Sequence, residues 1–127
     1  NYVDYMVKTP DGNYSQVVDK GITGAKKAEL SYEVLKTIDG EAAGMPGTEL
    51  SLVRVALKTG RHHQIRVQMA HAGMPLLGDR KYNPGEISQL PLGLCSCHLI
   101  FRHPITGKKM EFQVTPNGES FAGFPNP

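Results

Sequence analysis

Polar and apolar residues alternate along much of the chain up to Leu57, and this period of two is typical of β-strands that bury one face. The short segments Tyr2–Lys8 and Tyr14–Val18 flank a turn sequence, so they are expected to pair as a hairpin. Alternation over Ala28–Ile38 and Glu49–Gly60 predicts two longer strands. The second of these is mostly apolar, which favours a central position in the sheet.

The period changes to that of a helix after Gly60. The apolar residues at helical spacing, expected to form the stripe that faces the core, are Ile65, Met69 and Ala72. Thr59 is expected to cap the first turn. Gly73 suits the left-handed position that ends many helices, and Pro75 cannot continue the helix. A helix is therefore predicted over His62–Ala72.

The last third of the chain predicts one further hairpin. Gly93–Pro104 and Lys108–Val114 have strand-like composition and flank an Ile-Thr-Gly turn. The segments Asp19–Ala28, Asp39–Thr48 and Met74–Glu86 show no stable period and are predicted to be loops. The whole pattern predicts an α+β fold, a mostly antiparallel mixed sheet with one well-marked helix.

Composition narrows the class of protein. The chain has 127 residues, of which 39% are hydrophobic and 20% charged, as expected for one folded domain rather than a disordered chain. No apolar run is long enough to cross a bilayer, so no membrane partner is expected. Cys95 and Cys97 are too close on one strand to pair, and we expect two buried thiols in a reducing cytoplasm. A formal charge of +2 permits a nucleic-acid partner without requiring one.

The predicted helix concentrates basic and polar side chains, and three interpretations of it are open. A zinc helix usually places ligands four residues apart. Here His71 follows His62 by nine residues and His63 by eight, and no acidic residue lies on the helix, so a metal is not expected. A solvated basic helix is the ordinary alternative. In the third interpretation the helix faces an anion. Arg66, a surface neighbour of His63, then pairs with a carboxylate or phosphate.

The order of residues in this stretch carries further information. Leu57–Tyr82, LKTGRHHQIRVQMAHAGMPLLGDRKY, closely resembles the signature of the pseudouridine synthases of the ribosomal-large-subunit type A family. The matching positions are Thr59, Gly60, Arg61, His63, Gln64, Ile65, Arg66, Gly73, Pro75, Leu76, Gly78, Asp79 and Tyr82. Gly24–Leu35 and Leu99–Phe112 are also similar to family strands, so the resemblance covers nearly the whole chain.

The resemblance implies a reaction and a partner. Enzymes of this family isomerise a uridine in RNA to pseudouridine without a cofactor or metal, after the uridine is flipped from its stack. A catalytic aspartate attacks the nucleotide, and the arginine paired with it corresponds to Arg66. Ribosomal RNA is the more usual substrate and transfer RNA the less usual one. The residues expected to contact RNA are Arg61, His63, Gln64 and Tyr82, and Leu94 is expected to line the uracil pocket.

Structural roles for the same residues stay open beside these functional ones. His63 and Gln64 suit equally well the satisfaction of buried backbone groups behind the helix. Tyr82 suits equally well the closing of a loop on the core. At the position of Leu94 the family often continues with histidine, whereas this chain has Cys95, so no histidine role transfers.

One part of the family pattern is missing. The catalytic aspartate of the family lies in an Arg-Leu-Asp motif, which this sequence lacks, and Asp79 is expected to cap a turn rather than act as a nucleophile. Since the chain also begins at Asn1 without methionine, we expect residues 1–127 to be the C-terminal segment of a catalytic domain. Its missing N-terminal part would be a partner, and the segment alone would be inactive. The alternatives are a non-catalytic RNA-binding module and a plain metal-binding or protein-interaction domain.

Overall fold

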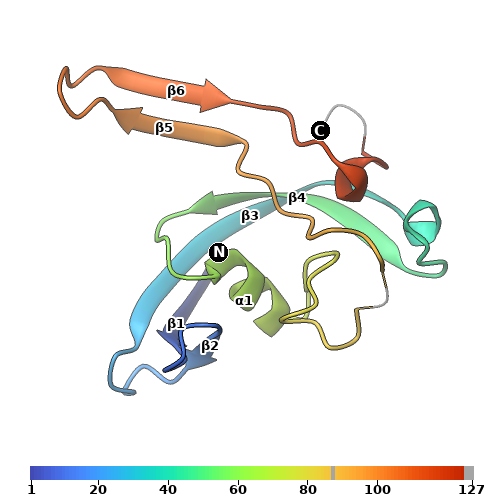
Figure 1. The fold of residues 1–127 in the computed structure, drawn as a ribbon, viewed down its shortest axis with the longest axis horizontal. Coiled ribbons are helices and arrows are strands. Elements are labelled where there is room, and N and C mark those ends of the chain that lie inside the picture. Colours follow the sequence, from blue (N-terminus) through green and yellow to red (C-terminus); the bar gives the residue numbers. More distant parts are fainter. Residues whose placement is uncertain (87, 125–127) are drawn as a thin grey trace.

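The computed structural model describes residues 1–86 and 88–124, which form a sheet, one helix and a separate hairpin (Figure 1). The four-stranded antiparallel sheet has the order β2-β1-β3-β4. Its strands are β1 (Tyr2–Lys8), β2 (Ser15–Val18), β3 (Lys26–Asp39) and β4 (Glu49–Leu57). The remaining elements are α1 (Gln64–His71), the hairpin strands β5 (His98–Arg102) and β6 (Lys109–Gln113), and short 3-10 helices at Gly40–Ala43 and Glu119–Phe121. The predicted α+β class is confirmed.

Hydrophobic alternation predicted where the strands of the sheet lie along the chain, but it predicted the wrong position in the sheet for one of them. β1 has the predicted bounds, whereas β3 begins earlier than predicted because Lys26 and Lys27 pair with Met6 and Tyr5 of β1. The predicted central position of β4 is wrong for the described residues. β4 pairs only with β3, lies at the edge of the sheet and buries only Leu52 fully.

Helix α1 has nearly the predicted bounds but a different start. His63 occupies the N-cap position with a left-handed φ of 54°, and no side chain caps the helix. The expected cap by Thr59 is therefore wrong, and its hydroxyl donates instead to Gln64 Oε1 at 2.8 Å. The predicted left-handed end of the helix at Gly73 is confirmed by a φ of 84°.

The buried face of α1 also differs from the expected stripe. Its buried residues are Gln64, Val67, Gln68 and Met69. Ile65 is only partly buried and Ala72 is exposed. Val67 packs against Met6 and Ala28 of the sheet, and Gln68 Nε2 donates to Asp4 Oδ2 at 2.9 Å. Two of the buried positions on α1 are thus glutamines, which a search for apolar residues does not find.

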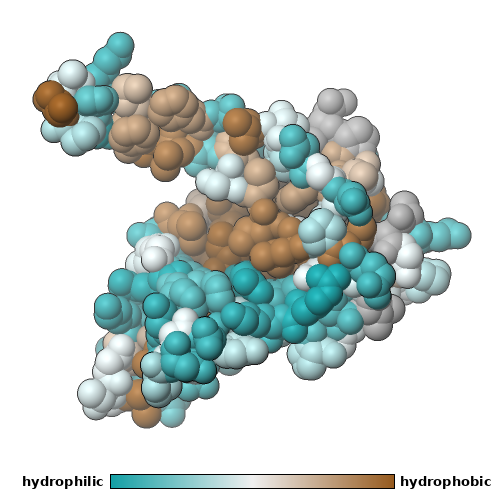
Figure 2. All heavy atoms as spheres, in the orientation of Figure 1, coloured by the Kyte–Doolittle hydropathy of each residue, from teal (hydrophilic) through white to brown (hydrophobic). Residues whose placement is uncertain are grey.

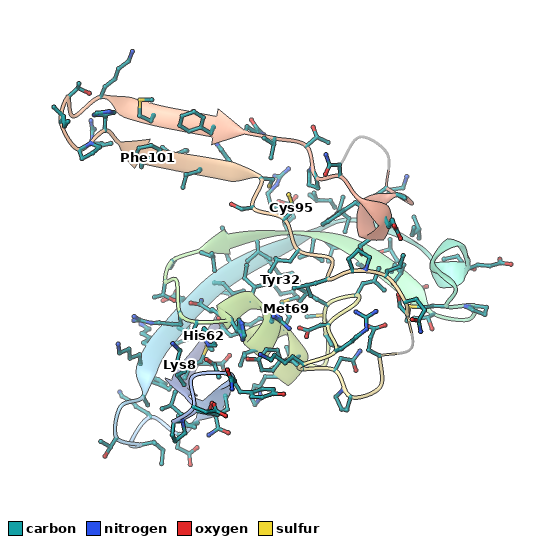
Figure 3. All side chains as sticks on the ribbon, viewed as in Figure 1. Lys8, Tyr32, His62, Met69, Cys95 and Phe101 are labelled. Carbon is teal, nitrogen blue, oxygen red and sulfur yellow. The ribbon has the colours of Figure 1, made fainter. Side chains whose placement is uncertain are left out.

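Apolar side chains also remain on the surface. Figure 2 shows an apolar band between the sheet and the projecting hairpin. A cavity of about 520 Å³ opens there, between β3, β4 and α1. Tyr32 and Met69, labelled in Figure 3, contribute to its lining. Among the described residues, no helix is long and apolar enough to cross a membrane.

The hairpin β5–β6 is exposed along nearly its whole length. The rings of Phe101 and Phe112 stack across it at 6.0 Å. Its first strand begins at His98 rather than at the predicted Gly93, so Cys95 and Cys97 lie before the strand and not on it. Both are free thiols, as predicted, but they are half-buried rather than fully buried.

Candidate functional site

The centre of the candidate site is a two-point ion pair between Arg66 on α1 and Asp79 in the following loop. Arg66 Nε donates to Asp79 Oδ2 at 3.0 Å and Nη2 donates to Oδ1 at 2.8 Å. The side chain of Asp79 is 1% exposed and that of Arg66 is 18% exposed. Asp79 Oδ1 also accepts from the backbone N–H groups of Lys81 and Tyr82, each at 3.1 Å. The expected turn-capping role of Asp79 is confirmed.

This environment keeps both partners charged. Burial by itself would raise the pKa of Asp79, but hydrogen bonds from Arg66 and from two backbone amides outweigh burial and lower that pKa. The hydrogen bond to Asp79 raises the pKa of Arg66. A carboxylate oriented and neutralised in this way is poorly placed to act as a nucleophile.

Tyr82 connects this ion pair to the β1–β2 hairpin. Its hydroxyl accepts from the Ser15 backbone N–H at 3.0 Å and shares a 2.6 Å hydrogen bond with His63 Nδ1. The guanidinium carbon of Arg66 lies 5.1 Å from the centre of the Tyr82 ring. Tyr82 therefore covers one side of Arg66 and fixes the position of His63.

Two adjacent histidine rings complete this side of the site. The rings of His62 and His63 stack at 3.8 Å, and His62 Nδ1 lies 2.7 Å from Ser15 Oγ. Burial lowers the pKa of both histidines. The charges of Lys8, Lys81 and Arg66 lower the pKa of His62 further, and His62 and Arg66 do the same for His63. Both effects favour the neutral form of the two rings.

Gln64 and Arg61 lie at the helix start, where their polar groups contact the sheet. Gln64 is 3% exposed; its Oε1 accepts from the Arg61 backbone N–H at 2.9 Å, and its Nε2 donates to the Glu29 carbonyl at 3.2 Å. Arg61 Nε donates to the Lys27 carbonyl at 2.8 Å. These contacts support the structural alternative for Gln64, and contact with RNA stays a prediction for both residues.

The structure thus brings some of the predicted site residues together and places another elsewhere. Tyr82 contacts both Arg66 and His63 and so brings these three predicted residues together. Leu94 instead lines the apolar cavity and is 42% exposed. Among the described residues, no three histidine, cysteine or acidic side chains are grouped to hold a metal ion.

Ser15 and Lys81 were missed by the sequence-based reasoning. Ser15 reaches the site only because the β1–β2 hairpin folds against α1, and no local signal in the sequence marks it. Lys81 had an indirect signal, because it lies between two positions that match the family signature, Asp79 and Tyr82.

Comparison with known proteins identifies the family. The family model for RNA pseudouridylate synthase matches residues 1–71. An uncharacterized RNA pseudouridine synthase of Aquifex aeolicus is 38% identical over 99 residues, which cover 70% of this chain and 29% of that protein. The dual-specificity RNA pseudouridine synthase RluA of Pasteurella multocida is 41% identical over 93 residues, covering 72% of this chain and 39% of that protein.

A third relative, the ribosomal large subunit pseudouridine synthase D of Vibrio vulnificus, is 40% identical over 82 residues, covering 52% of this chain and 25% of that protein. The chain therefore spans between 25% and 39% of the length of these relatives. Since residues 1–71 of the 127 match the family model and the signature around Arg66 is intact, the chain belongs to the RNA pseudouridylate synthase family.

Proposed function

We propose that this chain is the arginine-bearing part of an enzyme that isomerises uridine to pseudouridine within RNA. The observation that carries the proposal is the setting of Arg66. Asp79 takes one edge of its guanidinium and Tyr82 covers one side. No described residue accepts a hydrogen bond from its Nη1 group. A rigid cation with free N–H donors suits the binding of a second anion.

In the proposed reaction that second anion is the catalytic carboxylate, supplied by a part of the protein outside residues 1–127. Arg66 orients this carboxylate and keeps it ionised. The carboxylate attacks C1′ of the flipped nucleotide and displaces the uracil at N1. The freed uracil then bonds to C1′ through C5 and displaces the carboxylate, which is regenerated. The proton on C5 is lost and N1 gains one, so the reaction is an isomerisation that requires no cofactor.

The proposed substrate is ribosomal RNA rather than transfer RNA. One relative is named for the ribosomal large subunit and another is named as dual-specificity. The proposed site of action is the cytoplasm, in keeping with two free thiols in the segment before the hairpin. Leu94, on the apolar cavity, is proposed to contact the uracil.

Replacement of Arg66 in the whole protein tests this role. We expect Arg66→Ala to reduce pseudouridine formation to background while RNA affinity stays within a few-fold, because the pairing matters in catalysis more than in binding. Arg66→Ala also leaves Asp79 buried and unpaired, which costs about 3–5 kcal/mol of stability. Turnover is therefore measured per folded molecule, with folding followed by circular dichroism.

Arg66→Lys is the matched variant, since it leaves a cation beside Asp79 but removes the planar fork. We expect it to fold and to lose most of the turnover. Turnover above about a tenth of the wild-type rate in folded Arg66→Lys would contradict the role of the fork. A whole protein that binds RNA but forms no pseudouridine would instead support the RNA-binding module.

A further inference from the structure

A cluster of basic and aromatic side chains beside Arg66 has no part in the proposed reaction. It consists of Lys8 at the end of β1, Tyr14 in the β1–β2 turn, His62 and Lys81, and is called here the turn cluster. Figure 3 shows Lys8 and His62 on the same side of the molecule, at the start of α1. Tyr82 separates the turn cluster from Arg66, since its ring contacts both Tyr14 and the guanidinium.

Two members of the turn cluster, Lys81 and Tyr14, are held in place before any ligand arrives. Lys81 Nζ donates to the Asn13 carbonyl at 2.8 Å and lies 4.8 Å from the centre of the Tyr14 ring. The Tyr14 ring meets the Tyr82 ring edge to face at 6.0 Å. A lysine normally loses much rotamer freedom when it binds a ligand. Here the side chain is already positioned, and the ammonium group has further N–H donors to offer.

The charge of the turn cluster is positive and weakly compensated. The charges of Lys8, Lys81 and Arg66 all act on His62. Of the nearby carboxylates, Asp79 is already paired with Arg66. Asp11 in the turn accepts only from neutral groups, the hydroxyl of Thr9 and the backbone of Asn13, and within the described residues it forms no ion pair with Lys8 or Lys81.

The Tyr14 ring has the accessibility that stacking requires. Tyr14 is 44% exposed although two neighbours hold it in place. Single-stranded RNA is bound by aromatic platforms for the bases next to cations for the phosphates. Flipping one nucleotide out of a stack also leaves its neighbour unstacked, and a ring close to the site compensates for that loss.

We propose that the turn cluster binds the nucleotide next to the target uridine, with Lys8 and Lys81 on a phosphate and Tyr14 stacked on the unpaired base. The ligand class is single-stranded RNA. This inference rests on the proposed function for the position of the target uridine, but the binding itself does not require turnover.

The test measures binding of the whole protein to a fluorescent single-stranded oligouridine at several salt concentrations. Lys81→Met should weaken binding several-fold and reduce the slope of log affinity against log salt by about 0.7, as expected for one lost phosphate contact on a single strand. Tyr14→Leu should weaken binding by about five-fold or more, and Tyr14→Phe should bind like the wild type. Lys109→Met on β6 is the control of equal charge and should change the slope little.

The outcomes separate this inference from the proposed function. If Lys81→Met and Tyr14→Leu both bind like Lys109→Met, the turn cluster does not contact RNA and the inference is wrong, whatever the turnover. If both variants weaken binding in a protein that forms no pseudouridine, the inference holds and the proposed activity fails. Should Tyr14→Leu not fold, the salt slope of Lys81→Met decides.

Discussion

Asp79 is the most constrained charged side chain of the site. Both of its carboxylate oxygens accept hydrogen bonds, and the donors come from α1 and from its own loop. This arrangement fixes one edge of the Arg66 guanidinium while Tyr82 covers one side. A guanidinium held in this way loses little entropy when a further anion binds, and such preorganisation suits electrostatic stabilisation of a reacting carboxylate.

The stacked histidines make a prediction for stability against pH. Burial and nearby cations lower the pKa of His62 and His63 in the folded protein. The unfolded chain takes up protons below about pH 6.5, so the stabilisation is complete above that pH and is lost as the pH falls through the lower folded-state values. We expect the free energy of unfolding in urea to decline on acidification from pH 7 to pH 5.

The double variant His62→Gln/His63→Gln should show a shallower decline than the wild type over the same pH range. His71→Gln, at an exposed position in the last turn of α1, is the control and should retain the wild-type decline. Equal profiles for the wild type and the double variant would show that folding does not lower the pKa of the two rings.

At the scale of elements, local sequence patterns predicted where most strands and the helix lie along the chain. Alternation located β1, β3 and β4, and the change of period located α1. The edge position of β4 and the buried glutamines of α1 depend on which segments pack together, and a periodic pattern does not contain that information. The same reason explains the missed Ser15. Arg66 and Tyr82, in contrast, were indicated by the family signature.

The loop after α1 depends on Gly78. Its φ is +77°, and an added Cβ would overlap the Pro91 carbonyl and lie 2.8 Å from the Leu90 oxygen. We expect Gly78→Ala to cost about 2–4 kcal/mol, from left-handed strain together with the steric overlap. The measurement is urea unfolding. Because Asp79 follows directly, turnover of the whole protein should fall as well.

Gly24→Ala separates the two causes. Gly24 has a similar φ of +83°, but no atom lies within 4 Å of the position that an alanine Cβ would take, so the variant should cost only about 1 kcal/mol. Equal losses for the two variants would mean that the close approach to Pro91 does not contribute to stability.

At the scale of the whole molecule, the apolar band and the hairpin stand out. Apolar side chains that are more than half exposed include Val34, Leu57, Leu99, Ile100, Phe112 and Val114. Monomeric proteins rarely leave large contiguous apolar patches uncovered. The chain spans only 29% of its Aquifex relative, so a longer protein of that size has residues with which to cover them.

We expect residues 1–127, produced alone, to bind a hydrophobic dye and to self-associate as concentration rises, because the apolar band is open to solvent. A whole protein of the relatives' length should do neither. Dye fluorescence and sedimentation velocity measure the two effects. A monomeric fragment that binds no dye would contradict the exposure of the apolar band in solution.

The hydrogen bond between the Ser15 amide and the Tyr82 hydroxyl has a consequence for synthesis in the cell. It joins positions 67 residues apart in the chain. Translation proceeds at about 5–20 residues per second, so the hairpin waits roughly 3–13 s for its partner to be made. Arg66 is itself made late in that interval, 13 residues before Asp79, and at first it has neither Asp79 nor Tyr82 beside it. The anion-binding geometry is therefore a late product of folding, and a nascent chain acquires it only after the loop beyond α1 has left the ribosome.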